Sequence, residues 1–114
     1  DTRNPDGPYG GPALNWHQVR TVSAAGQCGI PSTAVALAVN ITAVTPSSSG
    51  YLKLFPAGWP QPDTSVISFS TDQTRSNNAL LFLSGAPERA FAVFPEMGYS
   101  ETVHMLVDVN GYFE

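Results

Sequence analysis

Apolar and polar residues alternate most regularly between residues 34 and 44. One face of this segment carries Val35, Leu37, Val39, Ile41 and Ala43, and the other carries Ala36, Ala38, Asn40 and Thr42. A period of two residues predicts a β-strand over Ala34–Val44 with one face in the core. The small residues of the second face would let another layer approach that side closely.

A second alternating segment lies at the end of the chain, over Thr102–Tyr112. Its apolar face carries Val103, Met105, Val107 and Val109, and its other face carries Thr102, His104, Leu106, Asp108 and Asn110. The pattern predicts a long strand that is central in its sheet and buried on one side.

Shorter segments of the same character predict the remaining strands. They are Gln18–Ser23, Tyr51–Phe55, Ser65–Ser70 with Ile67 and Phe69 inward, Ala79–Leu83 and Ala90–Phe94. Pro56 and Pro95 are expected to end two of these strands, because proline cannot donate a hydrogen bond to a ladder. Asn77 and Asn78 are expected to cap a turn through side-chain hydrogen bonds to the main chain.

Turn-forming residues separate these segments at short intervals. The chain has ten glycines and ten prolines, and no window keeps the 3.6-residue period of a helix. Seven or eight short strands joined by turns predict an all-β fold, either an antiparallel β-sandwich or a jelly roll. The length of 114 residues fits one such domain.

The beginning of the chain has a different composition. Residues 1–12 contain three prolines, several glycines and few apolar side chains. This composition predicts an extended arm over residues 1–14, followed by a single sandwich domain over residues 15–114.

Few residues are charged. Charged residues make up 12% of the chain, whereas soluble domains usually have about 25%. A surface of Ser, Thr, Asn, Gln, Gly and Pro suits an extracellular protein that touches solid or polymeric material. The chain begins at Asp1 without an initiator methionine, which is typical of a mature chain whose signal peptide has been removed or of an excerpt from a longer protein. We therefore expect an extracellular or cell-surface location.

Charge and hydropathy exclude two classes of partner. The net charge is −4, and the five basic residues are scattered along the chain. Nucleic-acid binding needs clustered Lys and Arg, so DNA and RNA are rejected as partners. No run of about 18 apolar residues exists, so we expect no insertion into a membrane.

Cys28 is the only cysteine, so no disulfide can form within the chain. A free cysteine is usually a small buried hydrophobe, and we expect that role for Cys28. The alternative is a cross-link to another chain.

Several short motifs resemble a widespread module of bacterial secreted and cell-surface proteins. They are Asp1-Thr2-Arg3, Cys28-Gly29-Ile30-Pro31-Ser32-Thr33-Ala34, Val39-Asn40-Ile41-Thr42, Gly50-Tyr51-Leu52, Phe55-Pro56-Ala57-Gly58, Gln73-Thr74-Arg75-Ser76-Asn77-Asn78-Ala79 and Val107-Asp108-Val109-Asn110-Gly111-Tyr112-Phe113. The last of these, a strand that ends in Asn-Gly-Tyr-Phe, is the most specific.

The resemblance covers nearly the whole chain and implies secretion and an all-β fold. The module often occurs in tandem or attached to exported enzymes and other exported domains, and it has no well-defined activity. Two segments depart from the pattern, the Gly/Pro-rich stretch Asn4–Pro12 and the loop around Trp59-Pro60.

No catalytic or metal-binding set stands out. His17 and His104 are the only bases for proton transfer near neutral pH, the sequence has no Gly-x-Ser-x-Gly elbow, and Cys28 has no base beside it. The nine acidic residues lie mostly in loops, with no supporting pattern for a carboxylate pair. Asp63, Asp72, Asp108 and Asn110 carry the oxygen ligands that calcium prefers, but no EF-hand loop is present. We therefore predict no enzymatic activity, no cofactor and no metal site.

The first functional hypothesis is an assembly module, a subunit or repeat of a secreted surface polymer or filament. A sandwich has edge strands with unpaired main-chain groups, and with Lys53 as its only lysine this chain has few charges to guard them. The arm could bind a neighbouring copy or a neighbouring domain of the same protein. The residues assigned to this interface are Asp1, Thr2, Arg3, Tyr9, Pro12 and Leu14.

The second hypothesis is a carbohydrate-binding module. Trp59 lies between Gly58 and Pro60 in a predicted loop, and Tyr99 and Trp16 also lie in turn-rich segments. Exposed aromatic rings can stack on sugar rings, so Trp59, with Tyr99 or Trp16 as a second platform, would bind a polysaccharide. The opposing interpretation is that these rings cover loop backbone.

Overall fold

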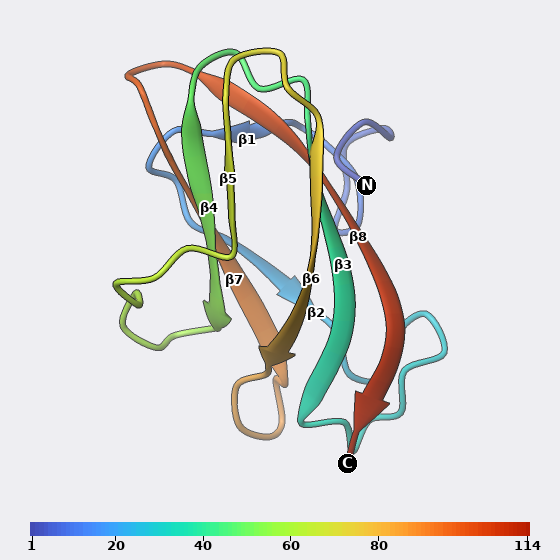
Figure 1. Cartoon of the computed structure of the whole chain (residues 1–114). Coiled ribbons are helices and arrows are strands. Elements are labelled where there is room, and N and C mark those ends of the chain that lie inside the picture. The colour runs from blue at the N-terminus through green and yellow to red at the C-terminus, as the bar shows by residue number, and fades with distance from the viewer.

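The computed structural model describes the whole chain, residues 1–114, and consists of strands joined by loops (Figure 1). The eight strands are β1 (Leu14–Asn15), β2 (Arg20–Ser23), β3 (Ala36–Val44), β4 (Gly50–Pro56), β5 (Ile67–Phe69), β6 (Arg75–Phe82), β7 (Ala90–Met97) and β8 (Thr102–Phe113). The structure contains no helix that is long and apolar enough to cross a membrane.

The strands form two four-stranded antiparallel sheets that pack face to face. The order is β1-β8-β3-β6 in the first sheet and β2-β7-β4-β5 in the second. The pairs β1–β8, β2–β7, β3–β6 and β4–β5 are all hydrogen-bonded, which is the pairing of a long hairpin rolled into a jelly roll. The predicted all-β sandwich is therefore confirmed.

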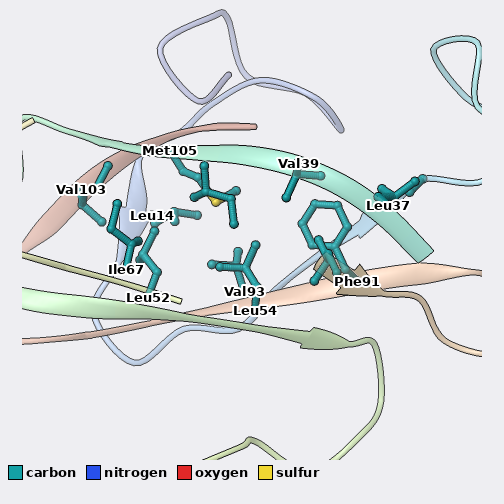
Figure 2. Packing of buried hydrophobic residues seen from close by; sticks show 14 of the residues in the cluster. Leu14, Leu37, Val39, Leu52, Leu54, Ile67, Phe91, Val93, Val103 and Met105 are labelled. Carbon is teal, nitrogen blue, oxygen red and sulfur yellow. The ribbon is translucent and has the colours of Figure 1, made fainter. Parts of the chain in front are cut away.

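The core lies between the inner faces of the two sheets, as Figure 2 shows. Leu37, Val39 and Ile41 of β3 point inward and are almost fully buried, as their alternation predicted. Ile67 and Phe69 of β5 are also buried, as expected. Apolar residues from both sheets, including Leu14 of β1, belong to one cluster of 19 buried residues.

The last strand has its predicted central position, between β1 and β3, at one end only. β8 pairs with β3 from His104 to Phe113, and β1 covers only Thr102 and Val103 on the other side. Most of β8 is therefore an edge strand. Its inward alternation holds for Val103 and Met105, whereas Val109 is 42% exposed.

A β-bulge interrupts the ladder between β3 and β8. Ala38 pairs with Gly111 and Val39 pairs with Val109, so Asn110 is the extra residue of β8. A bulge bends its strand and increases the local twist. It also places Tyr112 opposite Leu37, on the same face as Val109.

The expectation that Pro95 ends its strand is wrong. β7 continues through Pro95, which pairs with Leu52 of β4, as far as Met97. The carbonyl of Pro95 accepts a hydrogen bond of 2.9 Å from the His17 N–H, on the side away from β4. Main-chain groups of one residue point to the same side in an antiparallel ladder, so the missing N–H leaves the pairing with β4 intact. Pro56 is the last residue of β4, in keeping with its predicted role.

The expectation of a turn at Asn77 and Asn78 is also wrong. β6 begins at Arg75, and Asn77 and Asn78 pair with Ile41 and Asn40 of β3. Pairing with a well-formed neighbouring strand overrides the weak strand preference of asparagine. The side chain of Asn77 also donates a hydrogen bond of 2.9 Å to the Val66 carbonyl.

The segment predicted to be an extended arm folds back on its own sandwich. The Gly7 N–H donates to the Gly11 carbonyl and the Gly10 N–H donates to the Gly7 carbonyl, so these residues form a tight loop. A side chain at Gly10 would place its Cβ 2.1 Å from the Pro5 carbonyl oxygen, which explains the glycine. Leu14 is only 1% exposed and belongs to the core, so the core begins inside the predicted arm.

Candidate functional site

A cleft of about 360 Å³ opens between the edge strands β2 and β8, where the two sheets separate. Its apolar walls come from both sheets and include Val22, Leu37, Phe91, Met105, Val107 and Val109. Several of these side chains also contact the core cluster, so the cleft is a place where the core reaches solvent. A second hollow of about 350 Å³, beside β5 and β6, has a mainly polar lining.

One wall of the cleft is an unpaired strand edge. The carbonyl of Met105 accepts a hydrogen bond from the Thr2 N–H, so the main chain of Met105 points away from β3. Because this direction alternates along a strand, Val107 and Val109 present their N–H and carbonyl groups on the same side. No strand pairs with β8 on that side beyond Val103.

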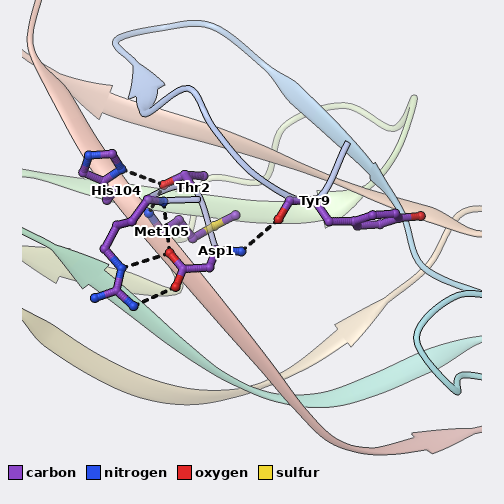
Figure 3. Close-up of polar contacts among 6 residues, drawn as sticks. Asp1, Thr2, Tyr9, His104 and Met105 are labelled. Atoms are coloured by element: carbon purple, nitrogen blue, oxygen red, sulfur yellow. Dashed lines mark hydrogen bonds and ion pairs between the residues drawn. The ribbon is translucent and has the colours of Figure 1, made fainter. Parts of the chain in front are cut away.

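The N-terminal loop closes one end of the cleft. Figure 3 shows the polar contacts that hold this loop in place. The Thr2 N–H donates to the Met105 carbonyl over 3.0 Å, and the Met105 N–H donates to Thr2 Oγ1 over 2.8 Å. The Asp1 nitrogen donates to the Tyr9 carbonyl, which fastens the two ends of the loop together. The loop therefore occupies β8 as far as Met105 and leaves the rest of the edge free.

Charges near the cleft are mostly paired or used to hold the loop. The Arg3 guanidinium binds both carboxylate oxygens of Asp1. The Arg20 guanidinium donates to the carbonyls of Pro12 and Ala13, which ties the loop to β2. Asp108 forms neither a salt bridge nor a side-chain hydrogen bond and is the one unpaired charge at the rim. The cleft is therefore suited to an apolar, uncharged ligand segment.

His104 lies beside the loop and bonds to it. Its Nδ1 is 3.0 Å from Thr2 Oγ1, the oxygen that also accepts the Met105 N–H. The structure contains no hydrogen bond from His104 to a carboxylate, so the Asp108 carboxylate on the same strand face does not orient the ring. Thr2 is only 6% exposed. These contacts anchor the loop, and they do not assemble a nucleophile, base and acid.

The expected burial of Cys28 is wrong. Cys28 is exposed and has a φ of 51° in the turn between Gly26 and Gly29. This turn carries its side chain to the mouth of the cleft rather than into the core. The thiol is free and provides a chemical probe of the cleft.

The residues predicted for an assembly interface are only partly brought together. Asp1, Thr2 and Tyr9 line the cleft. Leu14 is buried in the core instead, and Pro12 contributes only its carbonyl, which Arg20 binds. Arg3 does not line the cleft and is linked to it only through its ion pair with Asp1.

The aromatic residues predicted for sugar binding fall into two places. The rings of Trp16 and Tyr99 are 4.8 Å apart at 53°, and Tyr99 is 81% exposed. His17 lies beside this pair, with its ring 4.6 Å from that of Trp16. Its Nε2 is 3.1 Å from the Glu96 carboxylate. Trp59 is exposed in the loop after β4 and forms no ring pair. The structure thus joins Trp16 with Tyr99 and leaves Trp59 apart.

The structure contains no group of three or more His, Cys, Asp or Glu side chains that could hold a metal ion. The candidate calcium ligands Asp63 and Asp72 lie in the two loops on either side of β5, far along the chain from Asp108 of β8. Comparisons with protein-family models, curated proteins and solved structures found no match.

Sequence reasoning missed the apolar walls of the cleft as functional residues. Val22 and Phe91 were assigned to strands, and Val107 and Val109 to a buried strand face. The only sequence signal was the surplus of apolar residues in β8, which cannot indicate that one side of the strand is left unpaired. The cleft depends on β2 and β8 lying at corresponding edges of two sheets.

Proposed function

We propose that this domain is a non-enzymatic assembly module of an exported protein, which accepts an extended strand of a neighbouring copy along β8. The observation that carries the proposal is the unpaired edge of β8 beside an apolar cleft that opens onto the core. An extended peptide needs a row of main-chain donors and acceptors with pockets for alternate side chains, and this site offers both.

The binding mode would be strand addition. The N–H and carbonyl groups of Val107 and Val109 would pair with the incoming main chain. The seven residues from Val107 to Phe113 would span roughly 20 Å, which fits an incoming strand of five to seven residues. Every second side chain of that strand would point into the cleft and cover Val22 and Phe91.

The energetics favour an apolar donor strand. Each new hydrogen bond contributes about 0.5–1.5 kcal/mol, whereas an apolar side chain moved from water into the cleft contributes about 1.5–3 kcal/mol. Two or three alternate apolar residues would therefore supply most of the affinity. A negatively charged residue in the cleft would find no free partner, because the Arg20 guanidinium already binds two carbonyls and Arg3 binds Asp1.

Three further observations support an exported assembly protein. Only 12% of residues are charged, and β8 has no lysine along its free edge. The motifs that end in Asn-Gly-Tyr-Phe resemble a module of secreted and cell-surface proteins that often occurs in tandem.

Alkylation of Cys28 tests the proposal, because this free thiol lies at the mouth of the cleft. Two synthetic peptides serve as donors, with the sequences of residues 1–14 and 102–113. We expect one of them, or a rising concentration of the protein itself, to slow alkylation at least several-fold. In the Val109→Lys variant, which places a charge in the cleft, the rate should not respond.

The matched control is Val19→Lys, which changes an exposed valine in the loop before β2 and should leave the protection of Cys28 unchanged. Alkylation that stays constant at every peptide and protein concentration would contradict strand addition at β8.

We propose sugar binding as the second candidate function. The specific observation in its favour is the pair of Trp16 and Tyr99, two of the three residues predicted for that role, with His17 and Glu96 beside them as polar groups. A polysaccharide chain would stack on Tyr99 and hydrogen-bond to the imidazole or the carboxylate. This site lies on β7 and the loops next to it, apart from the cleft, so the two functions can be tested separately.

A further inference from the structure

The edge strand on the opposite side of the first sheet carries exposed apolar side chains. Leu80 of β6 is 54% exposed and Phe82 is 58% exposed. Both lie on the outer face of the sheet, because they pair with Ala38 and Ala36, whose side chains also point away from the core. Nothing in the structure covers these two side chains.

The outer face around them is flat and apolar. Ala36 has Phe82 on one side and Phe113 on the other, and Ala38 has Leu80 and Gly111. The two phenylalanines lie roughly 10 Å apart across β3. Ala36 is only 2% exposed although its side chain points outward, because both of its register partners are phenylalanines.

The edge of β6 has none of the features that keep edge strands apart. From Ser76 to Phe82 the strand has no charged residue and no proline, and its ladder with β3 runs without a bulge. The Leu83 N–H donates to the Val35 carbonyl, which directs the main chain of Leu83 toward β3. By alternation, Asn78, Leu80 and Phe82 present their main-chain groups on the free side.

We propose that β6 pairs with β6 of a second copy of this chain. The result is an antiparallel two-fold dimer in which the first sheets of the two copies are joined edge to edge. A strand edge can pair with the same edge of a second copy across a two-fold axis, because each main-chain N–H of one strand then faces a carbonyl of the other. The register that places Leu80 of each copy opposite Phe82 of the other makes two cross-strand apolar pairs. This inference rests on β6 alone and does not depend on the cleft at β8.

The size of the contact decides its strength. A fully buried aromatic side chain covers roughly 150–250 Å², so the half-exposed Phe82 and Leu80 offer on the order of 200 Å² per copy. Two copies reach on the order of 400 Å², well below the roughly 1,200 Å² of stable interfaces. Main-chain pairing is therefore needed, and we expect a weak dimer with a dissociation constant on the order of 0.1–1 mM.

Together with strand addition at β8, a weak β6 pair would give each copy two interfaces on opposite edges of one sheet. A two-fold contact alone closes at a dimer, whereas a second contact on the other edge allows an open-ended array. The β6 contact would then align neighbours that the β8 contact holds.

Sedimentation analysis over a concentration series up to about 1 mM tests the β6 pair in the Val109→Lys background, which blocks association at β8. The Val109→Lys chain should shift from monomer to dimer. With Leu80→Lys added, which places a charge on the exposed face, it should remain a monomer. With Leu80→Pro added it should also remain a monomer, because proline removes the N–H that faces Phe82 of the other copy and leaves the ladder with β3 in place.

A matched control completes the test. Val19→Lys, added to the same background, changes a similarly exposed valine elsewhere and should still dimerise. A melting curve confirms that each variant is folded. A Val109→Lys chain that is monomeric at every concentration would overturn the inference, as would a chain with Leu80→Pro in that background that dimerises normally.

Discussion

Thr2 and Met105 are joined by two hydrogen bonds although 103 residues separate them along the chain. The Thr2 main chain donates to Met105 over 3.0 Å, and the Thr2 hydroxyl accepts from the Met105 N–H over 2.8 Å. The same hydroxyl reaches His104 Nδ1. One threonine therefore holds the N-terminal loop against the edge strand and forms one end of the cleft.

Replacement of Thr2 by valine should destabilise the fold by about 1–3 kcal/mol. Valine keeps the size and shape of the side chain but leaves the buried Met105 N–H without an acceptor. Urea unfolding monitored by tryptophan fluorescence measures the change. Thr2→Ser retains the hydroxyl and should lose less than half as much, and equal losses for the two variants would contradict the role of the hydroxyl.

Leu14 tests whether the predicted arm belongs to the folded domain. It is almost fully buried among core residues of both sheets, so Leu14→Ala should destabilise the protein by about 2–5 kcal/mol. The thermal midpoint should fall accordingly, whereas Val19→Ala at an exposed site should change it little. A small effect of Leu14→Ala would show that residues 15–114 fold without the preceding segment.

The sequence predicted the fold class and most strands because alternation reports burial directly. β3 and β8 have inward apolar residues at every second position, and the structure confirms them at Leu37, Ile41 and Met105. The first half of β6 was missed because Arg-Ser-Asn-Asn has the composition of a turn. Its strand conformation comes from pairing with β3, a contact between residues that lie more than 30 positions apart.

The candidate site could be predicted even less well. The alternation of β8 is the same whether its far side is paired or free, so neither Val107 nor Val109 could be assigned to a cleft from the sequence. Trp16 and Tyr99 could be named as exposed aromatic residues. Their rings, 4.8 Å apart, are brought together by the pairing of β1 with β8 and by the hydrogen bond from the Trp16 N–H to the Glu101 carbonyl, which join two distant loops.

Gly50 should not tolerate a side chain. It begins β4 and pairs with Met97, and an added Cβ would lie 2.2 Å from the Glu96 carbonyl oxygen. Main-chain atoms of a ladder cannot move aside without loss of pairing, so Gly50→Ala should destabilise the protein by about 1–3 kcal/mol. Gly111→Ala is the matched control, because nothing lies within 4 Å of a Cβ at that position of β8. Equal melting temperatures for the two variants would contradict the packing at Gly50.

If the domain binds a polysaccharide, Tyr99 should carry much of the affinity. Its ring is 81% exposed and lies against Trp16, which limits its orientations and leaves surface for a sugar ring. Loss of one stacked aromatic ring removes on the order of 1–1.5 kcal/mol, so Tyr99→Ala should weaken retention on cellulose, chitin or purified cell wall about fivefold to tenfold.

Trp59→Ala gives the comparison within the same chain, because Trp59 is also exposed but forms no ring pair. A loss of retention with Tyr99→Ala alone assigns binding to the Trp16–Tyr99 surface, and a loss with Trp59→Ala alone assigns it to the loop after β4. The Val109→Lys variant should retain sugar binding, since neither Trp16 nor Tyr99 lines the cleft. A wild-type chain that is not retained on any of these polymers would exclude the carbohydrate function for them and leave strand assembly as the activity to test.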